Sequence, residues 1–203
     1  MHNLPKHKSG FTLIELMVSI SVAAVVLGIA IPNFAEIIAS SRLTTSANEL
    51  VAALNLARSE AVKRGVSVTV RRVDNSSFTR KDPAADWEDG WDVFTDVNGD
   101  GNFDAGDGDT LIRTYAGLPA NYTLRGNNNF VSFIRYDRDG ISNQPGSFAI
   151  CNNSDGNNIP EANTSRLIIV NFLGRVRMGA DANNSGIPED ENGNDIPSCT
   201  AGF

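Results

Sequence analysis

One carboxylate, Glu15, lies in a stretch of the chain that is otherwise uncharged. From Phe11 to Ile31 the sequence has 21 residues that are almost all apolar, and Glu15 is the only ionisable side chain among them. At about 1.5 Å per residue, a helix of this length reaches roughly 30 Å, which is enough to cross the core of a bilayer. A carboxylate at that depth costs at least about 2.5 kcal/mol. Glu15 therefore needs a positively charged partner, which the segment itself does not contain.

A second group of polar residues has the spacing of a calcium-binding loop. Six residues fit its positions 1, 3, 5, 6, 9 and 12, namely Asp96, Asn98, Asp100, Gly101, Asp104 and Asp107. Calcium prefers such oxygen ligands, and glycine permits the sharp turn. Asp107 is shorter than the glutamate expected at position 12. A hairpin loop rich in Asp, Asn and Gly is the alternative, because these residues favour turns without any metal. Calcium is thus a candidate ligand, and no cofactor is required.

Two arginines, Arg175 and Arg177, form the third candidate site. On a strand they project to the same face, about 7 Å apart, which suits successive phosphates of DNA. The formal charge of the chain is −7, and it becomes −9 if the first ten residues, which contain Lys6 and Lys8, are cleaved off. This negative charge opposes DNA binding. The acidic tail that begins at Asp181 opposes it as well. The alternative is an exposed strand whose arginines pair with acidic loops or protect a sheet edge.

The remaining inventory disfavours catalysis. Both histidines lie within the first ten residues, so the chain beyond them has no Ser-His-Asp or Cys-His system and no histidine-containing zinc site. We therefore expect neither an enzyme nor a small-molecule substrate. In an exported domain the two cysteines, Cys151 and Cys199, predict one disulfide. It would close a loop of about 49 residues, contribute roughly 3–4 kcal/mol, and fasten the polar C-terminal tail to a core strand.

The elements that position these residues begin with a long helix. Pro32 predicts a kink, or the point at which the helix leaves the membrane. The helix then has a transmembrane first part, residues 11–32, and an amphipathic second part, residues 33–64. Gly65 is placed as its C-terminal cap. In the second part, apolar residues recur at spacings of four and three: Leu43, Ala47, Leu50, Leu54, Ala57 and Ala61.

Residues 65–203 predict a β-rich globular domain with an acidic C-terminal tail. Alternating or continuous apolar runs between Gly, Asn, Asp and Pro clusters predict eight strands, at residues 66–70, 90–95, 110–115, 122–125, 130–135, 147–151, 166–172 and 175–178. One long helix followed by antiparallel strands indicates an α+β fold, with the second half of the helix packed on an antiparallel sheet.

The N-terminal pattern resembles that of a type IV prepilin: a short basic leader, residues 1–10, then phenylalanine, then glutamate five residues in. The resemblance implies cleavage after Gly10 by a prepilin peptidase and N-methylation of Phe11. It also implies that Glu15 pairs with the N-terminal amine of a neighbouring subunit. The protein would be a single-pass inner-membrane protein with a periplasmic C-terminal domain. An assembly platform in the inner membrane would then deliver it to an extracellular pilus tip or a periplasmic pseudopilus.

Within the pilins, the chain resembles the GspH/FimT family, which includes the minor pilins FimT and FimU. The matching segments are residues 57–61, 90–91, 94–101 and 174–177. The family implies a minor pilin that initiates or caps a filament together with other major and minor pilins, in pilus assembly and twitching motility.

Two alternatives to that role stay open within the family. One is the minor pseudopilin H of type II secretion. The other is a DNA-binding minor pilin for natural transformation, because a G-R-x-R motif in some FimT-type pilins is implicated in DNA capture; here it would use Arg175 and Arg177. Outside the family, a membrane enzyme is a third alternative, which the absence of histidine beyond residue 10 disfavours.

Overall fold

The computed structural model describes residues 10–73 and 86–201, apart from the side chains of residues 31–33. Of the expected leader, residues 1–10, all but Gly10 lies outside the described residues. The chain divides into two compact units, Met1–Ala39 and Ser40–Phe203.

The described part of the chain contains one α-helix, α1 (Leu13–Arg64), which continues through Pro32. It ends as the sequence predicts. The N–H of Gly65 donates to the carbonyl of Ala61 at 2.9 Å, and Gly65 adopts a φ of +68°. A residue with a Cβ is disfavoured in this left-handed conformation, so glycine stops the helix here.

Residues 11–29, most of them in the first part of α1, pack against no other described part of the chain. Every residue from 11 to 29 is exposed, with Leu13 at 76% and Ile29 at 65%. By length and composition, this is a helix that could cross a membrane. An apolar surface of this extent needs a cover of lipid or of other apolar helices.

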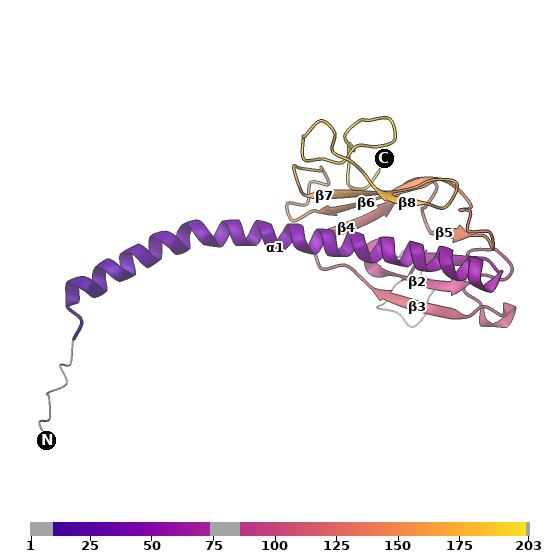
Figure 1. The fold of residues 1–203 in the computed structure, drawn as a ribbon, viewed down its shortest axis with the longest axis horizontal. Coiled ribbons are helices and arrows are strands. Elements are labelled where there is room, and N and C mark those ends of the chain that lie inside the picture. The colour runs from indigo at the N-terminus through magenta and orange to yellow at the C-terminus, as the bar shows by residue number, and fades with distance from the viewer. Residues whose placement is uncertain (1–9, 74–85, 202–203) are drawn as a thin grey trace, which may run out of the picture. The chain divides into compact units, whose positions relative to one another are not determined.

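The strands of the described residues form two antiparallel four-stranded sheets, most of whose strands are labelled in Figure 1. The first has the order β3-β2-β1-β5, with β1 at Val68–Arg72, β2 at Gly90–Thr95, β3 at Leu111–Ala116 and β5 at Phe133–Tyr136. The second has the order β4-β6-β7-β8, with β4 at Tyr122–Gly126, β6 at Gly146–Asn152, β7 at Ser165–Val170 and β8 at Val176–Met178. The predicted α+β fold is confirmed, but the strands form two sheets rather than one.

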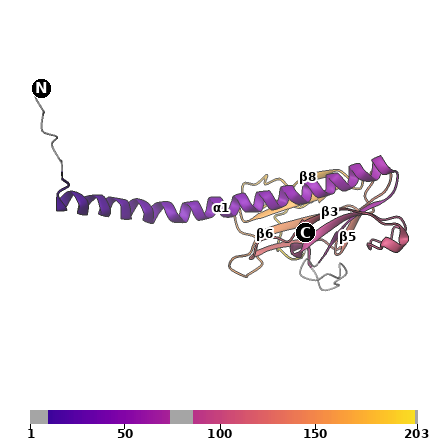
Figure 2. The same cartoon turned by 90° about the horizontal axis from the view of Figure 1, so that it is seen from below.

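The apolar stripe on the second half of α1 holds the two sheets together. Its six predicted residues, Leu43, Ala47, Leu50, Leu54, Ala57 and Ala61, are all fully buried. They share one core with residues of both sheets, among them Val70 and Trp91 of the first sheet and Phe148 and Ile168 of the second. The second half of the helix lies along both sheets in the two views of Figures 1 and 2. Burial of this stripe fixes which face of each sheet points inward.

The second sheet is covered on both faces. Strand β7 has a continuous apolar run, which is typical of a strand buried on two sides. Ile168 faces the main core, while Leu167 and Ile169 pack in a smaller cluster with Ile196. Ile196 belongs to the acidic tail, residues 181–201, hereafter called the C-terminal segment. That segment forms the yellow loops beside β6, β7 and β8 in Figure 1. The acidic tail is therefore folded against the sheet and is not simply a solvated extension.

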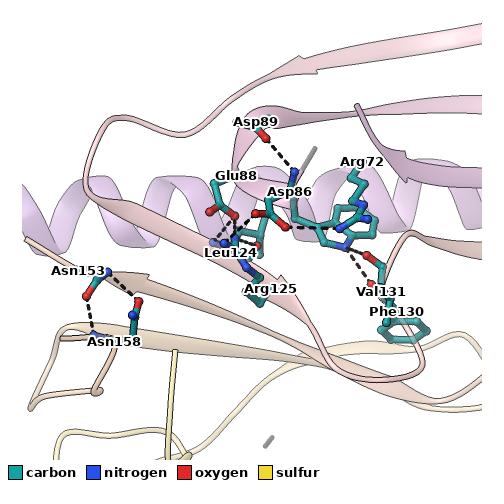
Figure 3. Close-up of polar contacts among 11 residues, drawn as sticks. Arg72, Asp86, Glu88, Asp89, Leu124, Arg125, Phe130, Val131, Asn153 and Asn158 are labelled. Carbon is teal, nitrogen blue, oxygen red and sulfur yellow. Dashed lines mark hydrogen bonds and ion pairs between the residues drawn. The ribbon is translucent and has the colours of Figure 1, made fainter. Parts of the chain in front are cut away.

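Ion pairs join the two sheets near one end. Arg125 of β4 contacts the carboxylates of Asp86 and Glu88, and Arg72 of β1 contacts Asp86 at 3.5 Å. Figure 3 shows the guanidinium groups of both arginines directed toward the short acidic segment of residues 86–89. Trp87 lies within it, is 1% exposed, and donates from its indole nitrogen to the carbonyl of Phe130 at 2.8 Å. The segment thus acts as a clasp between β1 and β4.

Candidate functional site

Glu15 lies in the first turn of α1. Its backbone N–H donates to the hydroxyl of Thr12 at 3.3 Å, and its carbonyl accepts from Ser19. The Thr12 and Glu15 positions have the spacing of a capping box, of which the Thr12 half is formed. Among the described residues, none pairs with the carboxylate of Glu15, which is exposed. The predicted recruiting group is thus accessible to a partner from another chain.

Thr12 was not predicted as a residue that caps the helix, although the Thr-x-x-Glu spacing could have identified it. Its hydroxyl satisfies an N–H at the helix start, which has no partner within the helix. The two residues of the predicted processing site precede it. Gly10 is exposed, and the side chain of Phe11 is 81% exposed. Cleavage after Gly10 and methylation of Phe11 remain predictions.

The predicted calcium loop joins β2 to β3, and Asp109 closes it. One oxygen of Asp109 accepts from the N–H of Val97 at 2.9 Å, and the other from the N–H of Asp104 at 3.0 Å. The side chain of Asp104 accepts from Gly106 at the start of a short 3-10 turn, η2 (Ala105–Asp107). Asp109 was not predicted as a site residue, because it lies beyond the twelve positions of the pattern.

Asp96, at position 1 of the pattern, is fully buried, with no exposed surface. Its Oδ2 accepts from the hydroxyl of Thr69 on β1 at 2.7 Å and from the N–H of Gly101 at 3.0 Å. Its Oδ1 is buried and has no hydrogen-bond partner. Elsewhere in the loop, the side-chain amide of Asn98 donates to Asp107 at 2.8 Å. These bonds bring positions 1 and 6, and positions 3 and 12, of the pattern together.

Two arginines of the first sheet hold the outside of the loop. Arg71 donates to the carbonyl of Gly101 at 2.8 Å, and Arg135 donates to the carbonyl of Gly99. Burial and then repulsion from Arg72 lower the pKa of Arg71, and the nearby Asp100 opposes that shift. Within residues 10–73 and 86–201, no three acidic, histidine or cysteine side chains already lie close enough to hold a metal. Calcium binding therefore stays a prediction.

Arg177 lies in the edge strand β8 and Arg175 directly before it, and both are exposed. Arg177 pairs with Ile169 across the sheet, so its side chain lies on the face covered by the C-terminal segment. Arg175 precedes β8, which begins at Val176, so only Arg177 lies within this strand and the expected common face of the two arginines is not formed by strand alternation. Neither guanidinium has an ion-pair partner in the described part of the chain.

Carboxylates of the C-terminal segment approach the same face. Asp190 and Glu191 line a small cavity of about 180 Å³ together with Leu167 and Ile169. Backbone and side-chain donors in the turn, with Asn194 first, lower the pKa of Asp190, so this carboxylate is ionised at neutral pH. The face that carries Arg177 thus also carries fixed negative charge.

The cysteines hold this segment in place. Cys151 of β6 and Cys199 form the disulfide that the sequence predicts, and both are buried. The N–H of Cys199 also donates to the carbonyl of Asn158 at 2.9 Å. Figure 3 shows Asn158 bonded to Asn153 in the loop after β6. The bridge therefore joins the C-terminal segment both to a core strand and to a second loop.

Comparison with known proteins agrees with this architecture. The prokaryotic N-terminal methylation motif matches residues 5–31. No curated protein sequence matches the chain. Two crystal structures of the Pseudomonas aeruginosa type IV minor pilin FimU, in space groups P21 and P65, are similar in fold at 20% identity. They align with TM-scores of 0.53 and 0.51, covering 78% and 77% of this chain and 96% and 99% of theirs.

The fold is thus that of a pilin: a long apolar N-terminal helix that continues into an antiparallel β domain. Membership of such a family implies association with other pilins and processing at the methylation motif. The family described as type II transport protein GspH matches residues 46–174, which is more than half of the chain. The chain therefore belongs to the GspH family of type IV pilin-like proteins.

Proposed function

We propose that this protein is a minor pilin of a type IV pilus, which enters the filament through the first part of α1 and helps to initiate or cap it. The observation that carries the proposal is that every residue from 11 to 29 is exposed, with Glu15 as their one carboxylate. Lipid covers this surface before assembly, and the apolar helices of other subunits cover it afterwards.

Glu15 supplies the recruiting charge in this proposal. A lone carboxylate in the bilayer costs at least about 2.5 kcal/mol, so a cation that meets it there is held strongly. Cleavage after Gly10 would create such a cation, the amine of Phe11, on each processed subunit. The partner is the amine of another pilin, because the described residues of this chain offer none to the Glu15 side chain.

We infer that the filament is a pilus and not a secretion pseudopilus. The solved structures with a similar fold are those of a type IV minor pilin, whereas the matching family is described by its role in type II transport. The same helix serves either filament. The alternative is therefore the minor pseudopilin H of type II secretion.

A deletion strain separates the two roles. We expect loss of surface pili and of twitching, with normal secretion of type II substrates. Loss of secretion with normal pili would assign the protein to the pseudopilus. Complementation with Glu15→Ala should fail to restore the lost phenotype, whereas Glu36→Ala should restore it. Glu36 is the matched control, because it is an exposed carboxylate of the same helix outside the apolar run. If Glu15→Ala restores function fully, the proposed recruitment is wrong.

A DNA-binding minor pilin is the second candidate. It is favoured by the exposure of Arg175 and Arg177 and by their lack of acidic partners among the described residues. Asp190 and Glu191 near the same face weaken it, since DNA affinity depends on phosphate neutralisation. A gel shift at low salt with the purified chain tests it. Binding that Arg175→Gln with Arg177→Gln abolishes, and that the exposed control Arg138→Gln leaves intact, would support this role; absence of binding would reject it.

A further inference from the structure

We propose that the loop between β2 and β3, residues 96–109, binds one calcium ion, with Asp96 at its centre. The observation that points to a cation is the buried Oδ1 of Asp96. This oxygen belongs to a carboxylate with no exposed surface, and it accepts no hydrogen bond. A buried charged acceptor without a partner is costly, and few native groups are left in that state.

The carboxyl group of Asp96 is bonded both to β1 and to its own loop. Its other oxygen, Oδ2, is held between the hydroxyl of Thr69 and the N–H of Gly101. Because the Gly101 bond comes from within the loop, the carboxylate is anchored on the loop side of β1. A cation bound to Oδ1 would give this oxygen the partner that it lacks, and both hydrogen bonds of Oδ2 would remain.

The glycine at position 6 of the pattern is required by the structure. Gly101 has a φ of +75°, and a Cβ at this position would lie 2.6 Å from the ring of Phe133. Because the backbone turns sharply here and leaves no space for a side chain, only glycine fits, as at the same position of a calcium loop. The turn places the N–H of Gly101 on Asp96.

The other ligands are available on the same loop. Asn98, Asp100 and Asp107 are exposed side chains at positions 3, 5 and 12. The carbonyl of Asn102, at position 7, accepts no hydrogen bond from any described residue. Position 9 of such loops often acts through a water molecule, and Asp104 occupies it here. Carboxylate, amide and backbone oxygens are the donor set that calcium takes.

The two arginines beside the loop donate to backbone carbonyls that are not ligands in the calcium pattern. Arg71 and Arg135 donate to the carbonyls of Gly101 and Gly99, at positions 6 and 4. Neither position supplies an oxygen ligand in the pattern. The guanidinium groups thus support the outside of the loop, and neither donates to the Oδ1 of Asp96.

The ligands still have to move to bind an ion. No three acidic side chains of the described residues lie within metal-binding reach of one another, and the amide of Asn98 donates to Asp107. Calcium would replace that bond and draw the two side chains inward. Because position 12 carries the shorter aspartate and the loop must rearrange, we expect a dissociation constant of about 10⁻⁴–10⁻³ M, as in extracellular calcium modules. Magnesium should bind more weakly, since it demands a tighter octahedral site.

The test uses the full chain in detergent, freed of metal with EDTA and titrated with calcium chloride in a calorimeter. We expect one ion per chain. Calcium at about ten times its dissociation constant should raise the melting temperature by about 3–6 °C. Magnesium chloride at the same ionic strength should give a much smaller rise. Failure of the wild-type chain to bind calcium at 10 mM would overturn the proposal.

Two variants with the same change in net charge locate the site. Asp100→Asn with Asp107→Asn should weaken calcium binding at least tenfold and should melt like the wild type in EDTA, since both side chains are exposed. Asp139→Asn with Asp155→Asn removes two exposed carboxylates outside the loop and should keep the full response. If both variants respond alike, calcium is screening charge generally and the loop is not its site. The measurement needs no pilus, so its outcome is independent of the proposed function.

Discussion

Removing the disulfide should destabilise the globular unit more than most single substitutions do. The relevant variant is Cys151→Ala with Cys199→Ala, which deletes the bridge and leaves no free thiol. Both side chains are buried, and the bridge joins β6 to the C-terminal segment across 48 positions of sequence. That segment covers Leu167 and Ile169 with Ile196, so its release would also expose the outer face of the second sheet.

The magnitude follows from the length of the closed loop. For a sequence separation of 48 residues, the chain-entropy model gives about 4 kcal/mol at 25 °C. In a unit of this size, each 1 kcal/mol lowers the melting temperature by about 2–4 °C. The variant should therefore melt about 8–16 °C below the wild type.

The assay is thermal unfolding of the full chain in detergent, followed by calorimetry. Reductant should lower the melting temperature of the wild-type chain to that of the variant, and it should leave the variant unchanged. A difference below about 2 °C between the two chains would refute the reasoning. The C-terminal segment would then be held by its packing and hydrogen bonds alone, and the cross-link would restrict the unfolded chain very little.

Three further substitutions, two of them with a matched control variant, test the packing by chemical unfolding. Leu50→Ala, in the fully buried stripe of α1, should cost about 2–5 kcal/mol, whereas Val62→Ala at a 56% exposed position of the same helix should cost about 0.5 kcal/mol or less. Arg125→Met should cost about 1–3 kcal/mol, because it leaves two carboxylates of the clasp without their shared partner. Gly101→Ala should cost more than Gly156→Ala: both glycines have positive φ, but only the first added Cβ meets an aromatic ring.

The sequence predicted the strands well, because apolar runs and turn residues alternate clearly after Gly65. Strand β2 has the predicted bounds, while β5 begins at Phe133 rather than at Phe130. The reason is a turn in which the N–H of Phe130 donates to Asn127 at 2.8 Å, so that the Phe130 ring stacks on Phe148 in the core. An aromatic residue in such a turn cannot be told from the start of a strand by periodicity alone.

The division into two sheets could not be predicted, because it depends on pairing between distant strands. Strand β1 pairs with β5 across more than sixty residues, whereas β4, between them in sequence, pairs with β6. Hydrophobic pattern gives the inward face of each strand but not its neighbour. For the same reason the clasp at Arg125 was not foreseen, since its partners lie on a different part of the chain.

The candidate site shows the same limit on a smaller scale. Spacing alone identified Asp96 and the loop that follows it. Spacing could not reveal that Thr69 and Arg71, both from β1, would hold the loop from outside. These contacts come from strand pairing, in which Thr69 lies opposite Phe94. The sequence therefore predicted the residues that could bind an ion, and the fold determined which carboxylate is buried among them.

The two parts of α1 have separable roles, because they meet different surroundings. All buried apolar residues of the described chain lie between positions 43 and 199, within the unit Ser40–Phe203. The exposed residues 11–29 add nothing to that core, so changes among them should leave the folding of the globular unit intact. A defect caused by Glu15→Ala would then report on the association of subunits, whereas one caused by Leu50→Ala would report on folding. Comparing the amount of each variant in the membrane with the amount in the filament distinguishes the two causes.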